Sequence, residues 1–221
     1  MSKLVWDQIG ERFYETGTDR GVLFVQDDAG AYPKGVVWNG LTAVTQSPSG
    51  GEASPFYADN IKYLNLTGNE DFGGTIEAYY SPEEFDACDG SAELVPGVSI
   101  GQQKRKAFGF SYRTRIGNDV DEGDHGYKIH LIYGAKANPS ERNYTSVNES
   151  PEPTTLSWSF TTTPVNVTGF KPTAHLEIDS TKVDAEKLAA FEAVLYGSES
   201  EEARMPMPDE VAELIGTGVA G

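Results

Sequence analysis

The chain has 221 residues, of which 38% are hydrophobic and 11% aromatic, and its 34 acidic and 17 basic side chains give a formal net charge of −17 at pH 7. This length and apolar content suffice for one domain with a substantial core. The charge argues against binding of the DNA backbone, because phosphate binding relies on lysine and arginine side chains that release counterions. Solubility is the simplest alternative explanation for such an acidic chain.

The single cysteine, Cys88, excludes an intramolecular disulfide and gives no sign of an oxidising compartment. The opening residues have no apolar signal-peptide segment, and no run approaches the roughly 20 apolar residues of a membrane-spanning helix. We therefore expect a protein that is made and kept in the cytoplasm, or released only by lysis, and that has no membrane partner.

Short runs rich in Val, Thr, Tyr and Phe alternate with Gly, Asn, Asp and Ser, which is typical of antiparallel sheets. The predicted strands occupy residues 21–26, 35–46, 61–66, 74–80, 104–116, 126–135, 154–164 and 174–179. Within the second of these runs Gly40 indicates a bulge or bend. The sequence thus predicts a mainly β domain over residues 21–197, an antiparallel β-sandwich or barrel.

Residues 47–60 break both helical and strand periodicity, because they contain two prolines and two adjacent glycines. We predict a long loop here, and compact domains seldom carry loops of this length without a role. Packing over the domain's own surface and contact with another subunit are equally open for it. Its candidate contact residues are Pro48, Pro55, Phe56 and Tyr57.

Residues 1–20 show no clean period and form a predicted N-terminal arm. Aromatic side chains on such an arm either pack back on the domain or dock on another subunit. The candidates for this contact are Trp6, Phe13 and Tyr14.

Residues 81–90 predict a short helix with Ser81 as N-cap, Pro82 at the first position and Gly90 after its end. Cys88 on this helix is expected to be a small packing residue, since neighbouring aspartates would raise the pKa of a catalytic thiol.

The organising strand of the chain lies within residues 154–164, where Leu156, Trp158 and Phe160 alternate with serine and threonine. This period of two predicts one buried face, with Trp158 and Phe160 in the core. Pro164 ends the pairing because it has no N–H to donate.

The one long amphipathic helix follows the last predicted strand. Asp184 is its predicted N-cap and Gly197 its left-handed C-cap. Its core face carries Leu188, Phe191 and Leu195. Beyond it we expect an acidic C-terminal extension over residues 198–221, which includes a last apolar cluster.

Motifs for chemistry are weak. The acidic stretch 118–125 fails the calcium-loop template, and residues 106–113 fail the RNA-stacking pattern of an RRM. No nucleophile elbow, phosphate loop, zinc-protease motif or CxxC occurs, and three histidines are too few and scattered to predict a metal site. We therefore predict no catalytic residue, no cofactor and no metal, although the many carboxylates leave an acid–base enzyme open as a third reading.

Read as a whole, the chain resembles the major tail tube proteins of long-tailed, non-contractile bacteriophages. The resemblance rests on Trp158-Ser-Phe-Thr-Thr-Thr-Pro164, His175-Leu-Glu-Ile-Asp179, the helix from Lys187 to Gly197, and Asn39-Gly-Leu-Thr-Ala-Val-Thr-Gln46 with the long loop after it. It implies a β-sandwich with a flanking helix, hexameric rings, and rings stacked into a tube.

In that family the long loop and the terminal arms bridge neighbouring subunits and rings, and inner sheets line a channel for DNA. The implied partners are further copies of the chain and tape-measure, tail terminator and distal tail proteins, with genomic DNA passing through an acidic bore in the virion without specific binding. A ligand-binding β-sandwich, such as a carbohydrate-binding module, is the alternative from another class. It would need an exposed aromatic platform, whereas Trp158 is expected to be buried.

Overall fold

The structure, a computed structural model, describes residues 3–146, 149–150 and 152–216. The main strands are β1 (Tyr14–Val25), β2 (Gly35–Trp38), β3 (Leu41–Gln46), β8 (Gly73–Ala78), β11 (Phe108–Asn118), β12 (Glu122–Ala137), β13 (Leu156–Thr162) and β14 (His175–Asp179). They form an 8-stranded antiparallel sheet in the order β2-β1-β11-β12-β13-β8-β3, with β14 also paired to β12. The predicted mainly β, antiparallel fold class is confirmed.

Smaller elements complete the fold. The strands β4 (Ser49–Gly50), β5 (Ala53–Ala58), β6 (Ile61–Thr67), β7 (Glu70–Asp71), β9 (Ala92–Val95) and β10 (Val98–Ile100) form two-stranded pairs outside the main sheet. The helices are η1 (Glu83–Phe85), α1 (Asp86–Asp89), α2 (Ala185–Tyr196) and α3 (Pro208–Ile215). Among the described residues, none of these helices is long and apolar enough to cross a membrane.

The main sheet curls until its two ends meet. Strands β2 and β3 stand at opposite ends of the strand order, yet only Asn39 and Gly40 separate them in the chain. Gly40 takes a left-handed φ of 76°, which a residue with a side chain adopts only at a cost. The prediction of one strand over residues 35–46 with a bulge is therefore wrong, because Gly40 transfers the chain from one end of the sheet to the other.

Aromatic rings fill the inside of the curled sheet. The ring of Trp38 lies 4.6 Å from that of Phe85 and 5.4 Å from that of Trp158. Phe108 and Phe110 share this core, as their alternation predicts. The first core cluster thus joins β2, β11 and β13 with the short helical segment after β8.

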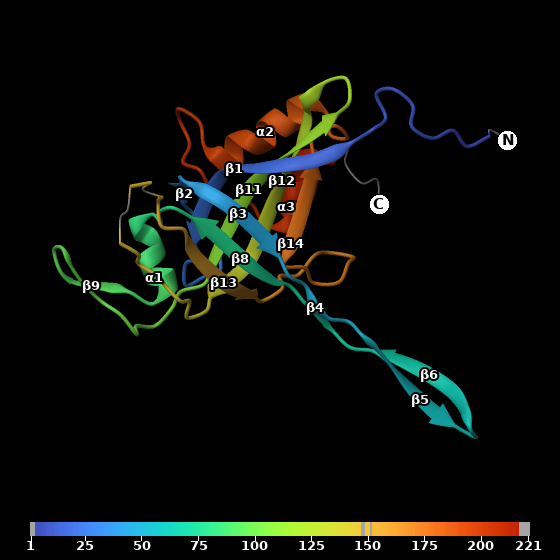
Figure 1. The fold of residues 1–221 in the computed structure, drawn as a ribbon, viewed down its shortest axis with the longest axis horizontal. Coiled ribbons are helices and arrows are strands. Elements are labelled where there is room, and N and C mark those ends of the chain that lie inside the picture. Colours follow the sequence, from blue (N-terminus) through green and yellow to red (C-terminus); the bar gives the residue numbers. More distant parts are fainter. Residues whose placement is uncertain (1–2, 147–148, 151, 217–221) are drawn as a thin grey trace.

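The outer face of β1, β11, β12 and β14 is covered by α2 and α3 (Figure 1). Leu23 of β1 points into the first core, whereas Val22 and Phe24 belong to the second cluster beneath the helices. Burial on both faces explains why residues 21–26 form a continuous apolar run.

Helix α2 begins as predicted, since the Asp184 carboxylate accepts hydrogen bonds from the backbone N–H groups of Glu186 and Lys187. Gly197 ends it with φ 82° and ψ 169°, so the predicted left-handed cap is wrong in ψ although the positive φ does require glycine. The five side chains assigned to the core from sequence are all buried: Trp158, Phe160, Leu188, Phe191 and Leu195.

The short helical segment after β8 is capped differently from the prediction. Pro82, not Ser81, is the N-cap residue, and no side chain donates or accepts there. Gly90 follows the end of the segment, as predicted, and takes a left-handed conformation with φ 88° and ψ 28°. Cys88 is buried, and its burial raises the pKa of the thiol to about 12.

The C-terminal segment packs on the domain and does not extend away from it. Met205 and Val211 are buried in the second core cluster, and the Met205 N–H donates to the carbonyl of Tyr32 at 3.1 Å. Lys187 Nζ donates to the carbonyl of Gly216 at 2.7 Å. Up to Gly216, the expected C-terminal extension over residues 198–221 is therefore part of the domain, because its apolar cluster covers the sheet. Residues 217–221 lie outside the described part of the chain.

Candidate assembly surfaces

A single β-ribbon leaves the barrel and projects far from it (Figure 1). It continues the pairing of β3 with β8 through the short pair β4–β7 into the hairpin β5–β6. At this neck Gly50 has a φ of 79°, and a Cβ there would lie 2.4 Å from the carbonyl oxygen of Asn69. Only glycine lets the two backbones approach so closely.

The predicted loop over residues 47–60 is wrong, because most of it forms strands. Asp59 and Asn60 make a two-residue turn with φ of 49° and 61°, the geometry that suits the twist of a hairpin. The two prolines and the adjacent glycines concealed the strand from periodicity. The available signal was a two-residue Asp-Asn turn between runs rich in aromatic residues.

Both faces of the β5–β6 hairpin are exposed over its whole length. The register shifts at Tyr63 of β6, because Phe56 pairs with Leu64 and Tyr57 pairs with Lys62. Strand β5 itself alternates, so Phe56 shares one side of the hairpin with Leu64 and Leu66, and Tyr57 lies on the other side. The exposed fractions are 50% for Phe56 and 70% for Tyr57. We call the exposed apolar surface that Phe56, Tyr57, Leu64 and Leu66 form on the two sides of this hairpin the hairpin face.

The two prolines of this segment lie in different parts of the ribbon. Pro48 sits between β3 and β4, and Pro55 lies within β5, opposite Asn65 of β6. Both are exposed. Strand β5 pairs only with β6, so its outer edge is open, which is where a proline is tolerated in a strand.

A second exposed hairpin lies at the opposite end of the molecule, where β9 is labelled in Figure 1. It pairs β9 with β10 and turns through Pro96 and Gly97, which has a φ of 81°. Its exposed apolar side chains are Leu94, Val95, Val98 and Ile100. No strand is predicted for this segment from its sequence pattern.

The N-terminal arm is attached at one point. The Gly10 N–H donates to Asp119 Oδ1 at 3.0 Å, and Asn118 Nδ2 donates to the Gly10 carbonyl at 3.3 Å. The Phe13 ring lies 5.0 Å from that of His125, near the start of β12. Before this attachment the arm leaves the body, and Trp6 is 74% exposed.

Tyr14 is the first residue of β1, where it pairs with Gly117, so the arm is shorter than residues 1–20. Beside this junction a pocket of about 610 Å³ opens between the arm and the barrel. It is lined by Phe13, Tyr14, Glu15, Ile116, His125, Lys128, Asp179, Thr181 and Lys182. The pocket gives the base of the arm an apolar recess with charged walls.

Two histidines that are far apart in the sequence meet in a stack of rings. His175 lies between Phe72, at 5.0 Å, and His130, at 5.5 Å, and His130 stacks on Tyr112 at 4.5 Å. The register of β12 with β14 makes this contact. Ile132 pairs with His175 and His130 pairs with Glu177, so the two histidines are diagonal neighbours on one face of the sheet. The sequence does not reveal this pair, because no pattern in either strand indicates that β12 and β14 are neighbours or fixes their register.

Both imidazoles of the stack are held in a neutral state. His130 Nδ1 lies 3.2 Å from His175 Nε2, and His130 Nε2 lies 3.0 Å from Thr114 Oγ1. Burial, and then the neighbouring His175, lowers the pKa of His130 to about 4. Burial also lowers the pKa of His175. No group of three or more metal-ligating side chains is present within the described residues.

Ion pairs fasten the twisted strand β1 to the sheet. Arg113 donates from Nε and Nη2 to the two oxygens of Asp19 at 2.7 and 2.8 Å, and this holds the pKa of Asp19 below its usual value. Lys128 bridges Glu15 and Glu177, and these hydrogen-bonded carboxylates raise its pKa. The pairs link β1 to β11 and, through Lys128, to β12 and β14.

The three tryptophans divide between core and arm. Trp38 and Trp158 are each 2% exposed, and the indole N–H of Trp38 donates to the carbonyl of Tyr80 at 2.8 Å. Trp158 therefore offers no exposed platform for a sugar ring, and Trp6 is the only tryptophan of the described chain at the surface.

No protein-family model and no curated protein matches the sequence. Among solved structures, the chain aligns with a chain of the sheath–tube complex of an extracellular contractile injection system, PVC, in its extended state. The identity is 14% and the TM-score 0.31, covering 72% of this chain and 88% of that one.

Two further alignments involve parts that end such tubes. One is with the tube-terminating cap of the anti-feeding prophage, at 9% identity and a TM-score of 0.34, covering 81% of this chain and 97% of that one. The other is with the sheath/tube terminator of the PVC system, at 11% identity and a TM-score of 0.29, covering 80% and 99%. At these identities and TM-scores the alignments assign no function to the chain.

Proposed function

We propose that this protein is a structural subunit that assembles with further copies of itself into stacked rings forming a tail tube. The β5–β6 hairpin is the observation that carries the proposal. An isolated two-stranded hairpin is marginally stable in water, and this one keeps a bulky apolar face away from its own barrel. A partner surface that covers the hairpin face accounts for both properties.

The open edges of the hairpin supply a second reason. Strands β5 and β6 pair only with each other, so each presents unpaired backbone groups along its outer edge. Such edges recruit strands from other chains. Because the main sheet curls round to bring β2 and β3 together, the projecting ribbon is where edge pairing between subunits is easiest.

The exposed elements also suit a head-to-tail arrangement. The β5–β6 hairpin and the β9–β10 hairpin lie at opposite ends of the molecule (Figure 1). Contacts between unlike surfaces generate rings or stacked filaments and not closed two-fold dimers. The hairpin face, the arm residues Trp6 and Phe13, and the junction at Tyr14 are the contacts we assign to neighbouring subunits.

The charge fits a conduit for DNA in a phage tail. A net charge of −17 provides little counterion release to retain a passing phosphate backbone. In this proposal the subunit has no catalytic role, and its partners are other copies, the proteins that start and end the tube, and the tape-measure protein.

Negative-stain electron microscopy and sedimentation over a concentration series test the proposal. We expect rings or hollow tubes from the unaltered chain, alone or with a tail initiator complex. The double variant Phe56→Ser/Tyr57→Ser should abolish them while the thermal unfolding of the barrel stays unchanged, because neither side chain touches the core.

The matched control removes an exposed aromatic side chain elsewhere. Phe170 is 82% exposed on the loop before β14, so Phe170→Ser deletes a similar apolar surface outside the hairpin and should leave assembly intact. A chain that stays monomeric at high concentration with an initiator present, or a double variant that assembles as well as the control, contradicts the proposal.

A further inference from the structure

A polar pocket of about 210 Å³ lies beside α1. Three segments frame it: residues 89–91 after α1, residues 101–105 before β11 and residues 138–142 after β12. The Gln103 N–H donates to the Gly90 carbonyl at 2.9 Å, which fixes two of these segments to each other. Trp158 of β13 completes the lining.

Two buried N–H groups in the lining have no partner. Neither the indole Nε1 of Trp158 nor Nε of Arg105 has a hydrogen-bond partner within the described part of the chain. Trp158 is 2% exposed, and the pocket is the cavity that its side chain lines. Buried donors are nearly always paired in folded proteins, and an unpaired one calls for a ligand or an ordered water.

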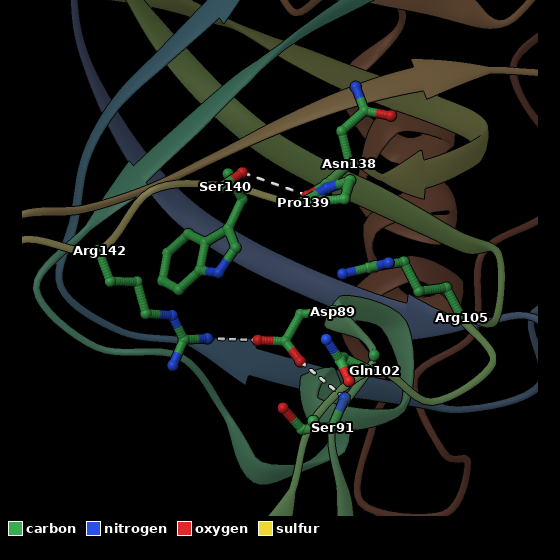
Figure 2. Close-up of a pocket in the computed structure, with 11 residues that line it drawn as sticks. Asp89, Ser91, Gln102, Arg105, Asn138, Pro139, Ser140 and Arg142 are labelled. Atoms are coloured by element: carbon green, nitrogen blue, oxygen red, sulfur yellow. Dashed lines mark hydrogen bonds and ion pairs between the residues drawn. The ribbon is translucent and has the colours of Figure 1, made fainter.

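The Arg105 side chain is held in place by its surroundings. Gly90 has a φ of 88°, and a Cβ on it would lie 3.0 Å from Arg105 Cζ. Because Gly90 has no side chain, the guanidinium of Arg105 can lie close against its backbone. In Figure 2 the guanidinium groups of Arg105 and Arg142 point inward from opposite sides, with Asp89 between them.

The pocket is locally positive in a strongly acidic protein. Arg142 pairs with Asp89, whose other oxygen accepts the Ser91 N–H at 3.1 Å. This leaves the guanidinium of Arg105 without a carboxylate partner among the described residues, and Lys104 and Lys106 flank it in the sequence. The lining thus carries two guanidinium groups against one carboxylate.

We propose that this pocket binds a carboxylate group. A planar carboxylate can accept from the flat fork of Arg105 and from the Trp158 indole together, and its single charge matches the one unpaired guanidinium. A phosphate, with a charge of about −1.5 to −2, would place excess negative charge beside Asp89. The acetate test of this site does not depend on the proposed tail function, since its readout is on Trp158 and the pocket involves none of the surfaces assigned to assembly above.

Trp158 itself provides the test, because an indole N–H gives a separate nuclear magnetic resonance signal. In ¹⁵N-labelled protein titrated with sodium acetate at constant ionic strength, we expect a saturable downfield shift of the Trp158 indole signal. The Trp38 indole, already bonded to the Tyr80 carbonyl, should not move. Magic-angle spinning gives the same readout if the protein is assembled.

Two variants separate the site from general charge effects. Arg105→Gln should weaken the acetate response about tenfold or more, because it removes a charge-assisted hydrogen bond. Lys104→Gln removes the same charge one position away on an exposed side chain and should leave the response unchanged. No saturable shift, an equal shift with chloride or phosphate, or an equal loss in both variants overturns the proposal.

The carboxylate can be a free organic acid or an acidic side chain of an adjoining copy, and sedimentation distinguishes these sources. If an adjoining copy supplies it, Arg105→Gln and high acetate both reduce the assembled fraction while Lys104→Gln does not. If a free acid is the ligand, both variants assemble equally and only acetate binding differs. Either result, together with the Trp158 shift, supports the site.

Discussion

The inner and outer halves of one β-ribbon are both strands, but they differ in how far their side chains are buried. Strand β8 alternates between buried and half-buried residues, and its Ile76 and Ala78 lie in the first core cluster. Strand β6, a few residues earlier on the same ribbon, is exposed at every position. Both halves are paired strands, but only the inner half contributes a buried face to the stability of the domain.

The largest effect is expected where the same truncation is made in the core. Phe191→Ala on α2 removes a fully buried ring from the second cluster. The loss of burial and the cavity left behind should lower the free energy of unfolding by about 3–5 kcal/mol. Urea denaturation measures it, and a loss under 1 kcal/mol, about what a surface change gives, would show that the helices are not part of the core.

The histidine stack ties core stability to pH. Unfolded histidine has a pKa of about 6.5 and His130 in the fold about 4, so stability is complete above pH 6.5 and is lost as pH falls through this window. The loss due to His130 should reach about 3 kcal/mol. His130→Gln should flatten the profile between these pH values, and an unchanged slope would show that His130 is not held neutral.

The neck of the ribbon should respond at an intermediate level. Gly50→Ala forces a side chain into a left-handed position and against the Asn69 carbonyl. We expect local opening at the neck to become easier by about 1–2 kcal/mol. Amide exchange of Gly51, whose N–H donates to Asn69 at 3.0 Å, reports it; Gly68→Ala, with open space around its Cβ, is the control.

The smallest effect on folding is expected at the hairpin face. Phe56→Ala is the same kind of truncation as Phe191→Ala, but the side chain is half exposed and lies outside both core clusters. The free energy of unfolding should change by no more than about 0.5 kcal/mol. A larger loss in denaturation experiments on the unassembled chain would mean that the ribbon folds as part of the core.

The parts of the fold that follow from sequence are those where burial imposes a period. Trp158 and Phe160 on a period of two, and Leu188, Phe191 and Leu195 on a helical face, are buried as their spacing indicates. A single buried face is enough to produce such a spacing of apolar residues, so these strands and helices can be predicted from the sequence.

The parts that do not follow from sequence lack such a pattern or depend on topology. The β5–β6 hairpin has no buried face, so its alternation is free of constraint, and Pro55 within it argues against a strand. Gly40 marks a break in the chain, but only the closed sheet reveals that the break joins opposite ends. His130 and His175 meet through a register that neither strand specifies alone.

The direct continuation of the ribbon into β3 and β8 also has a mechanical consequence. A pull on the hairpin tip runs along the strands, whereas their hydrogen bonds lie across it. The ladder between β8 and β13, from Ala78 opposite Leu156 to Gly73 opposite Thr161, is then loaded in shear, so its bonds share the force and do not open one after another. A hairpin that adds little to folding is thereby anchored to the barrel as a mechanically strong tether.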